Sequence, residues 1–212
     1  MNACRCLTIL LLIFLLAGRL HAYQENGITA LKTEAGVLLV WNQPDDYFTL
    51  EIKGKEIRPL NSSEHVFFTV DGIPFQVQSV AVSELLKDAG KLGQSPQSIL
   101  AAHKDWEAKY IESSLGRKLN VQSSLLVLKG GGQALFWKFD MPEGLSSDAR
   151  QQQYLSVVNG PNVLLLNGVV TGEEKESVVR QLLVDTMETL KKSPKPINLR
   201  QLQESIRNGR PR

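Results

Sequence analysis

Short apolar segments recur in pairs along this sequence, and each pair is joined by a turn. Valine, isoleucine, phenylalanine and tyrosine are common in the segments, whereas glycine, proline, asparagine and aspartate fill the joints, a pattern typical of β-hairpins. In the joint Asp71-Gly72, glycine permits the positive φ that a tight hairpin needs. The pairs are Val37–Asn42 with Tyr47–Lys53, His65–Val70 with Pro74–Val80, Val121–Leu128 with Gln133–Phe139, and Tyr154–Val158 with Val163–Val170.

A helix is predicted between the second and third hairpins. Ser95 is suited to its N-cap, and Pro96 follows at the first helical position, where its missing N–H costs nothing. Gly116 is suited to end it. Four residues recur with helical spacing and form one stripe: Ile99, His103, Trp106 and Tyr110.

A second helix is predicted after the last hairpin. It is expected to begin at Thr171, with Glu174 completing a capping box, and to end before Pro194. Runs of strands separated by isolated helices predict an α+β fold, with an antiparallel β-sheet and packed helices. We expect a single domain over residues 24–192.

The N-terminus has the pattern of a secretory signal peptide over residues 1–22. Arg5 precedes the apolar run Leu7–Gly18, which would extend only about 18 Å as a helix, short of a bilayer core of about 30 Å. Cleavage is expected after Ala22, with Gly18 as the second choice and an uncleaved anchor as the alternative. The mature protein is then expected to be secreted or periplasmic, with no transmembrane span.

Cysteine is confined to this leader, at Cys4 and Cys6. The mature chain would therefore form no disulfide and offer no thiolate for catalysis or metal binding. Arg19 follows Leu16-Ala17-Gly18 where a lipoprotein would need cysteine, which excludes lipid attachment there.

Charge is unevenly distributed along the mature chain. Residues 23–190 contain 15 basic and 21 acidic side chains, whereas residues 191–212 contain 7 basic and 1 acidic. An acidic body argues against a nucleic-acid-binding domain, whose signature is a basic face. The basic tail, residues 193–212, has few apolar residues and is expected to be flexible, with at most one turn of helix. It is either a solvated terminus or an arm that contacts acidic lipids or an acidic partner.

The segment QQQYLSVVNGPNVLLLNGVVTGEEKESVVRQLLVDTMETL resembles the closing hairpin and helix of the PsbP-like proteins. The resemblance covers about 40 residues and rests on a hydrophobic pattern: Tyr154, Val157 and Val158 in a strand, then Leu182, Leu183 and Leu190 in a helix. It implies an exported α/β/α sandwich and a role as an accessory or binding protein. It carries over no functional residue.

The residues that carry chemistry are sparse. His103 and Glu107 stand at i, i+4 on the first predicted helix, a spacing that can present two metal ligands on one face, but no third ligand is evident. The run Lys129-Gly130-Gly131-Gly132 lies between two strands and predicts a turn rather than a phosphate-binding loop. No nucleophile motif is present.

We therefore predict an exported, non-catalytic domain that binds a partner protein or a small ligand, without a cofactor. If it has a ligand-binding cleft, the expected residues are His103, Trp106, Tyr110 and Trp137, although aromatic residues in such positions more often belong to the core. The alternatives are a hydrolase or metal-dependent enzyme centred on His103 and Glu107, and a structural component of the cell envelope.

Overall fold

The computed structural model describes residues 23–25, 27–60, 66–89, 95–144, 148–172 and 175–208. The predicted signal peptide lies outside these ranges, as do His65, Glu174 and the last four residues of the tail.

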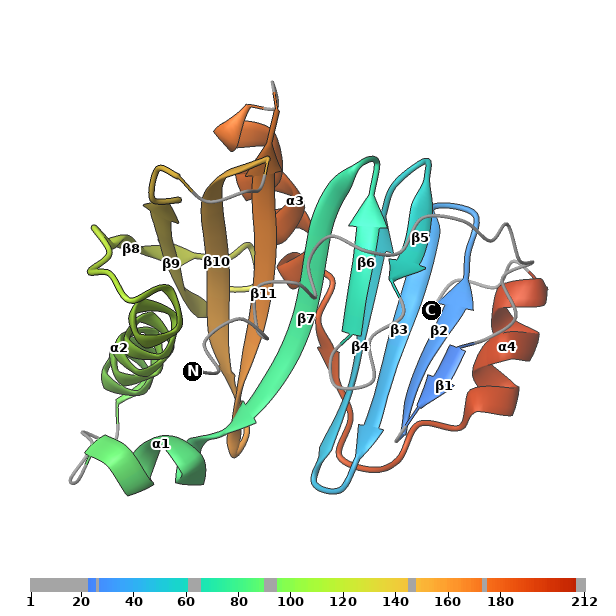
Figure 1. Ribbon diagram of the computed structural model, residues 1–212. Coiled ribbons are helices and arrows are strands. Elements are labelled where there is room, and N and C mark those ends of the chain that lie inside the picture. The colour runs from blue at the N-terminus through green and yellow to red at the C-terminus, as the bar shows by residue number, and fades with distance from the viewer. Residues whose placement is uncertain are drawn as a thin grey trace.

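Two antiparallel sheets form the body of this part of the chain (Figure 1). Sheet A has the order β1-β2-β3-β4-β12 and sheet B the order β5-β6-β7-β11-β10-β9-β8. The strands of sheet A are β1 (Tyr23–Glu25), β2 (Ile28–Lys32), β3 (Gly36–Gln43), β4 (Asp46–Lys53) and β12 (Lys191–Lys192). Those of sheet B are β5 (Ile57–Leu60), β6 (Val66–Val70), β7 (Ile73–Ala81), β8 (Gln122–Val127), β9 (Gln133–Asp140), β10 (Ala149–Asn159) and β11 (Asn162–Thr171).

Helices pack on three sides of these sheets. They are α1 (Val82–Ala89), α2 (Pro96–Leu115), α3 (Glu176–Glu188) and α4 (Leu199–Arg207). Helix α2 packs against β9 and β10 and lies at the left of Figure 1, α3 lies behind β11, and α4 lies beside sheet A. The α+β class with antiparallel strands and packed helices is confirmed.

All of the predicted hairpins form, as the pairs β3–β4, β6–β7, β8–β9 and β10–β11. The turns have the expected chemistry: Asp71 and Gly72 have φ of 50° and 90°, and Asp45 has φ of 60°. The prediction of one sheet needs correction, because the hairpins divide between two. The physical reason lies in β3, whose residues Val37–Trp41 are all buried because the strand is covered on both faces.

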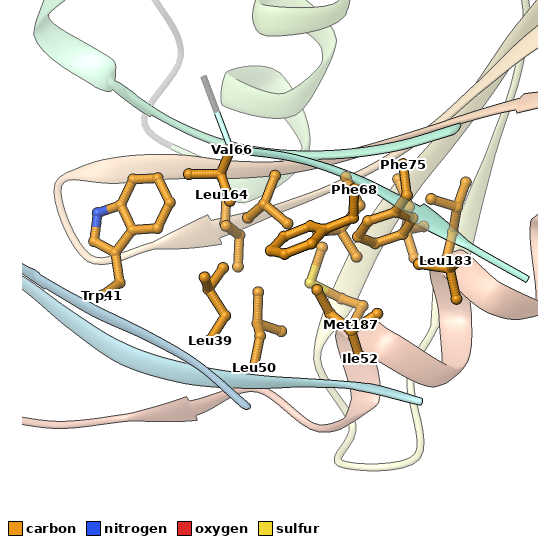
Figure 2. Close-up of a cluster of buried hydrophobic side chains, with 14 of the residues drawn as sticks. Leu39, Trp41, Leu50, Ile52, Val66, Phe68, Phe75, Leu164, Leu183 and Met187 are labelled. Carbon is orange, nitrogen blue, oxygen red and sulfur yellow. The ribbon is translucent and has the colours of Figure 1, made fainter. Parts of the chain in front are cut away.

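The main core lies between the sheets. Leu39, Leu50 and Ile52 of sheet A point toward Phe68 and Phe75 of sheet B (Figure 2). Helix α3 closes the same core with Leu183 and Met187. Sheet A and α3 therefore share one face of sheet B, and α2 occupies the other.

Helix α3 begins later than the sequence predicts. Thr171 belongs to β11, and the N-cap is Lys175, whose side chain makes no capping hydrogen bond. The helix approaches the sheet closely over Gly168, where a Cβ atom would lie 2.6 Å from the Cγ1 atom of Val179. A side chain at residue 168 would therefore force α3 away from β11.

Candidate functional site

Helix α2 has the predicted caps. The Ser95 side chain accepts a hydrogen bond from the Ser98 amide at 3.2 Å, and Gly116 ends the helix with φ of 65°. The helix packs across β9 and β10, and its buried residues Leu100 and His103 lie on the face toward sheet B.

Three of the four predicted ligand-binding residues lie in the layer between α2 and sheet B. His103 is 0% exposed and its ring centroid lies 6.2 Å from that of Trp106. Trp137, on β9, is also 0% exposed and stacks on Tyr154 of β10, with 3.8 Å between ring centroids and an interplanar angle of 3°. Tyr110 lies apart from them, 62% exposed. The arrangement is that of a packed core, with the fourth residue on the surface.

The layer between α2 and sheet B nevertheless contains buried polar atoms that have no hydrogen-bond partner among the described residues. Both ring nitrogens of His103 and the Nε1 atom of Trp137 lack a hydrogen-bond partner among the described residues. Burial lowers the pKa of His103 to about 4 and raises the pKa of Glu107 to about 7. Burial, and after it the charge of Glu107, raises the pKa of Tyr154 well above its usual value. At neutral pH the histidine is therefore uncharged.

The metal-binding alternative finds no further ligand here. Within the described ranges, no group of three or more histidine, cysteine, aspartate or glutamate side chains is placed to hold a metal ion. His103 and Glu107 are both on α2, and the ring that lies beside His103 is the aromatic side chain of Trp106.

The C-terminal tail contains a longer helix than the single turn that the sequence predicts. Residues 199–207 form α4, which packs on the outer face of β2 and β3 against Leu31, Leu38 and Val40. The side chain of Asn42 fixes the approach to the helix, since its Nδ2 donates to the Ile197 carbonyl at 2.9 Å and its Oδ1 accepts from the Ile197 amide at 2.8 Å.

The apolar side chains of the tail are too few to form a core by themselves. They are enough to cover the apolar face that β2 and β3 already present. The sequence signal was present: Leu199, Leu202 and Ile206 stand at i, i+3 and i+7, and Asn198 caps the helix by accepting from the Gln201 amide at 3.1 Å.

A groove of about 540 Å³ lies between α4 and β2. Leu31 and Ile206 are its apolar lining residues, and Lys32, Arg200 and Arg207 contribute three cationic groups. The remaining lining residues are Gln203 and Glu204. Sequence reasoning located the positive charge of the tail but missed the groove, because the groove exists only once α4 packs beside Lys32, far away in the sequence.

The cations of the groove are largely uncompensated. Arg200 pairs with Glu204 at 3.2 Å on the same helix, with both side chains well exposed. Lys32 and Arg207 have no acidic partner within 4.0 Å among the described residues. The groove therefore offers positive charge beside an apolar surface, an arrangement that suits an anionic ligand with some apolar character.

The described part of the chain contains no helix with the length and apolar character that crossing a membrane requires. No protein-family model matches the chain, and no curated protein sequence is similar to it. Among solved structures, the chain is similar to the solution structure of cyanobacterial PsbP from Synechocystis, with 8% sequence identity and a TM-score of 0.42, over 84% of this chain and 99% of that chain. The matched region thus extends well beyond the closing hairpin and helix on which the sequence resemblance rested.

Proposed function

We propose that this chain is an exported, non-catalytic binding domain, and that its groove between α4 and β2 holds an acidic segment of a partner protein. The observation that carries the proposal is the pairing of unneutralised cations, Lys32 and Arg207, with an apolar lining from Leu31 and Ile206. Ligand sites combine apolar walls with a small number of placed polar groups, and this groove has both.

The α2 layer is less suited to capturing a ligand from solution. His103 and Trp137 are fully buried there, so that a ligand would reach them only after α2 had moved off the sheet. The groove beside α4 needs no such movement, because its cationic side chains are already exposed.

Charge complementarity favours a peptide carrying several carboxylates. The groove lining has three cations and one acid, a net charge of 3 − 1 = +2. A flat anionic membrane would be attracted to the same charges, but it would leave the recessed apolar residues unused. An extended chain with an apolar residue between its acidic ones would use both.

The test is titration of the mature chain, residues 23–212, into a fluorescent peptide of about ten residues that alternates glutamate and leucine. We expect binding that weakens with added salt, since exposed charges are screened within about 8 Å at physiological ionic strength. The double variant Lys32→Gln/Arg207→Gln is expected to bind about tenfold more weakly, because it loses two favourable charge contacts.

The control is Lys53→Gln/Lys55→Gln, which removes the same charge from exposed positions outside the groove lining. It should change the affinity less than about twofold. Vesicles of phosphatidylglycerol form the second arm. Binding to vesicles without binding to the peptide would show that the groove serves an anionic membrane, and equal effects of the two double variants would show that the groove is not the site.

The location of the protein outside the cytoplasmic membrane is also part of the proposal, and it has a separate test. Cell fractionation with a C-terminal epitope is expected to find a shortened protein outside the cytoplasmic membrane, with its N-terminus at Tyr23. Full-length protein in the cytosol would contradict an exported domain.

A further inference from the structure

The strand β8 is an exposed edge of sheet B, and it differs from the other edge strands that the structure describes. Strand β5, at the opposite edge of this sheet, contains Arg58 and Pro59. In sheet A, β12 consists of Lys191 and Lys192, and β1 has three residues. Charge, proline and shortness are the features that keep edge strands from pairing with other chains. Strand β8 has none of these.

Residues 119–128, which contain β8, include no charged side chain, in a chain of which 22% is charged. Within the strand, Leu125 is 55% exposed and Val127 is 77% exposed. Leu126 packs against the core between the sheets, as does Leu128 just after the strand. Strand β8 is therefore held along its inner side by β9 and the core, and none of the other strands that the structure describes pairs with its outer side.

The exposed residues lie on one face of the sheet. Leu125 stands opposite Leu135 and Ser123 opposite Trp137, and both of these partners on β9 belong to the cluster beneath α2. Since residues opposite each other in an antiparallel pair project to the same face, Leu125 and Val127 continue the apolar surface of that cluster beyond the helix.

We infer that β8 pairs antiparallel with the β8 of a second copy of this chain, so that sheet B continues across a two-fold axis. An isologous contact brings the same patch of both subunits together. A charged side chain near the axis would therefore face the same charge on the other subunit and be repelled by it. The uncharged run of residues 119–128 meets this requirement, whereas a charged strand of a different protein would find no complementary charge in it.

The geometry allows such a pair. An axis perpendicular to the sheet keeps both α2 helices on the same side and places Leu125 opposite the second copy's Leu125, with Val127 opposite the second copy's Ser123. Strands are about 4.8 Å apart. Helices that lie over β9 and β10 would then be separated by about four strand spacings, roughly 19 Å, which exceeds a helix diameter of about 10 Å.

Sedimentation velocity of the mature chain over a range of concentrations tests the inference. We expect a reversible dimer in the wild type. Leu125→Lys and Leu125→Glu, each alone, should raise the dissociation constant at least about tenfold, because two like charges then face each other at the axis. An equimolar mixture of the two variants should dimerise again. Circular dichroism of each variant verifies that it is folded.

Val178→Lys is the matched control, since Val178 is 51% exposed on α3, which packs on the face of sheet B opposite to that of Leu125. It should leave the dimer unchanged. A wild type that stays monomeric at millimolar concentration would overturn the inference, as would a Val178→Lys effect equal to that of Leu125→Lys. Dimers of the single charge variants as tight as the wild type, or a mixture that does not restore pairing, would also overturn it.

Discussion

The side-chain amide of Asn159 donates a hydrogen bond of 2.8 Å to the Oδ1 atom of Asp46, and so joins the end of β10 in sheet B to the start of β4 in sheet A. Ser79, on β7, donates to the second carboxylate oxygen at 2.5 Å. Asp46 is only 4% exposed. A buried carboxylate on one strand of sheet A thus accepts hydrogen bonds from two strands of sheet B.

Replacing Asp46 by alanine is expected to lower the free energy of unfolding by about 1–3 kcal/mol, because the buried Asn159 amide and the half-buried Ser79 hydroxyl lose their acceptor. Equilibrium denaturation in urea measures the change. Glu34→Ala, at an exposed position, should stay within about 0.5 kcal/mol of the wild type. Similar losses in the two variants would mean that the link between the sheets contributes little.

The pKa values of His103 and Glu107 predict opposing pH dependences of stability. Between about pH 4 and 6.5 the unfolded chain binds a proton at His103 that the folded chain excludes, so this residue makes stability rise with pH. Between about pH 4.5 and 7 the folded chain retains a proton at Glu107 that the unfolded chain has released, so this residue makes stability fall with pH. From about pH 4.5 to 6.5 the two effects largely cancel.

Glu107→Gln removes the effect of Glu107 on the pH dependence of stability, so that the opposing effect of His103 should become measurable. We expect the stability of this variant, relative to the wild type, to rise between pH 4.5 and 7 by at most about 1.4 kcal/mol per pH unit. Denaturation curves collected across this range provide the measurement, and His103→Gln should tilt the profile in the opposite direction. Parallel profiles for the wild type and both variants would contradict the burial of these groups beneath α2.

Trp137 and Tyr110 are both candidate ligand-binding residues from the sequence, but they should respond differently to alanine. Trp137→Ala removes a fully buried ring from its stack on Tyr154 and should cost about 3–5 kcal/mol of stability. Tyr110→Ala should cost less than about 0.5 kcal/mol, because the ring is mostly exposed. Thermal unfolding of the two variants provides the comparison, and a large loss for Tyr110→Ala would place its ring in the core.

The cap of α4 should govern the local stability of that helix. Asn198→Ala removes the acceptor for the Gln201 amide, at a cost of about 1 kcal/mol, and should speed amide exchange in residues 201–207 about fivefold. Exchange in β10 should not change. Gln203→Ala is the control, since it leaves both ends of the helix intact, and an equal acceleration in that variant would exclude a specific role of the cap.

Local patterns were sufficient for the hairpins and for α2, because their turn residues and caps act over a few positions. Asp71-Gly72 and Ser95-Pro96 are examples, and both have the geometry expected of them. The division into two sheets was not predictable in this way. It depends on which face of β3 meets α4 and which meets sheet B, and these partners come from distant parts of the chain.

Contacts between distant parts of the chain also decide the nature of the candidate sites, and local sequence patterns do not reveal them. The stripe of His103 and Trp106 revealed the inner face of α2, but whether that face lines a cleft or a core depends on how closely Trp137 and Tyr154 pack beneath it. The capping pattern places the start of α3 too early in the sequence, because the apolar strand β11 continues to Thr171. In the groove, Lys32 and Arg207 lie together only through tertiary packing.

The position of α4 has a consequence for the order in which the molecule can be completed. The outer faces of β2 and β3, with Leu31, Leu38 and Val40, belong to an early part of the chain, and the helix that covers them to one of the last. While the chain is being synthesised, these side chains stay open to solvent long after both strands have emerged. A chain interrupted before residue 199 would leave that apolar face exposed to solvent. This exposed apolar surface would distinguish the interrupted chain from the folded protein.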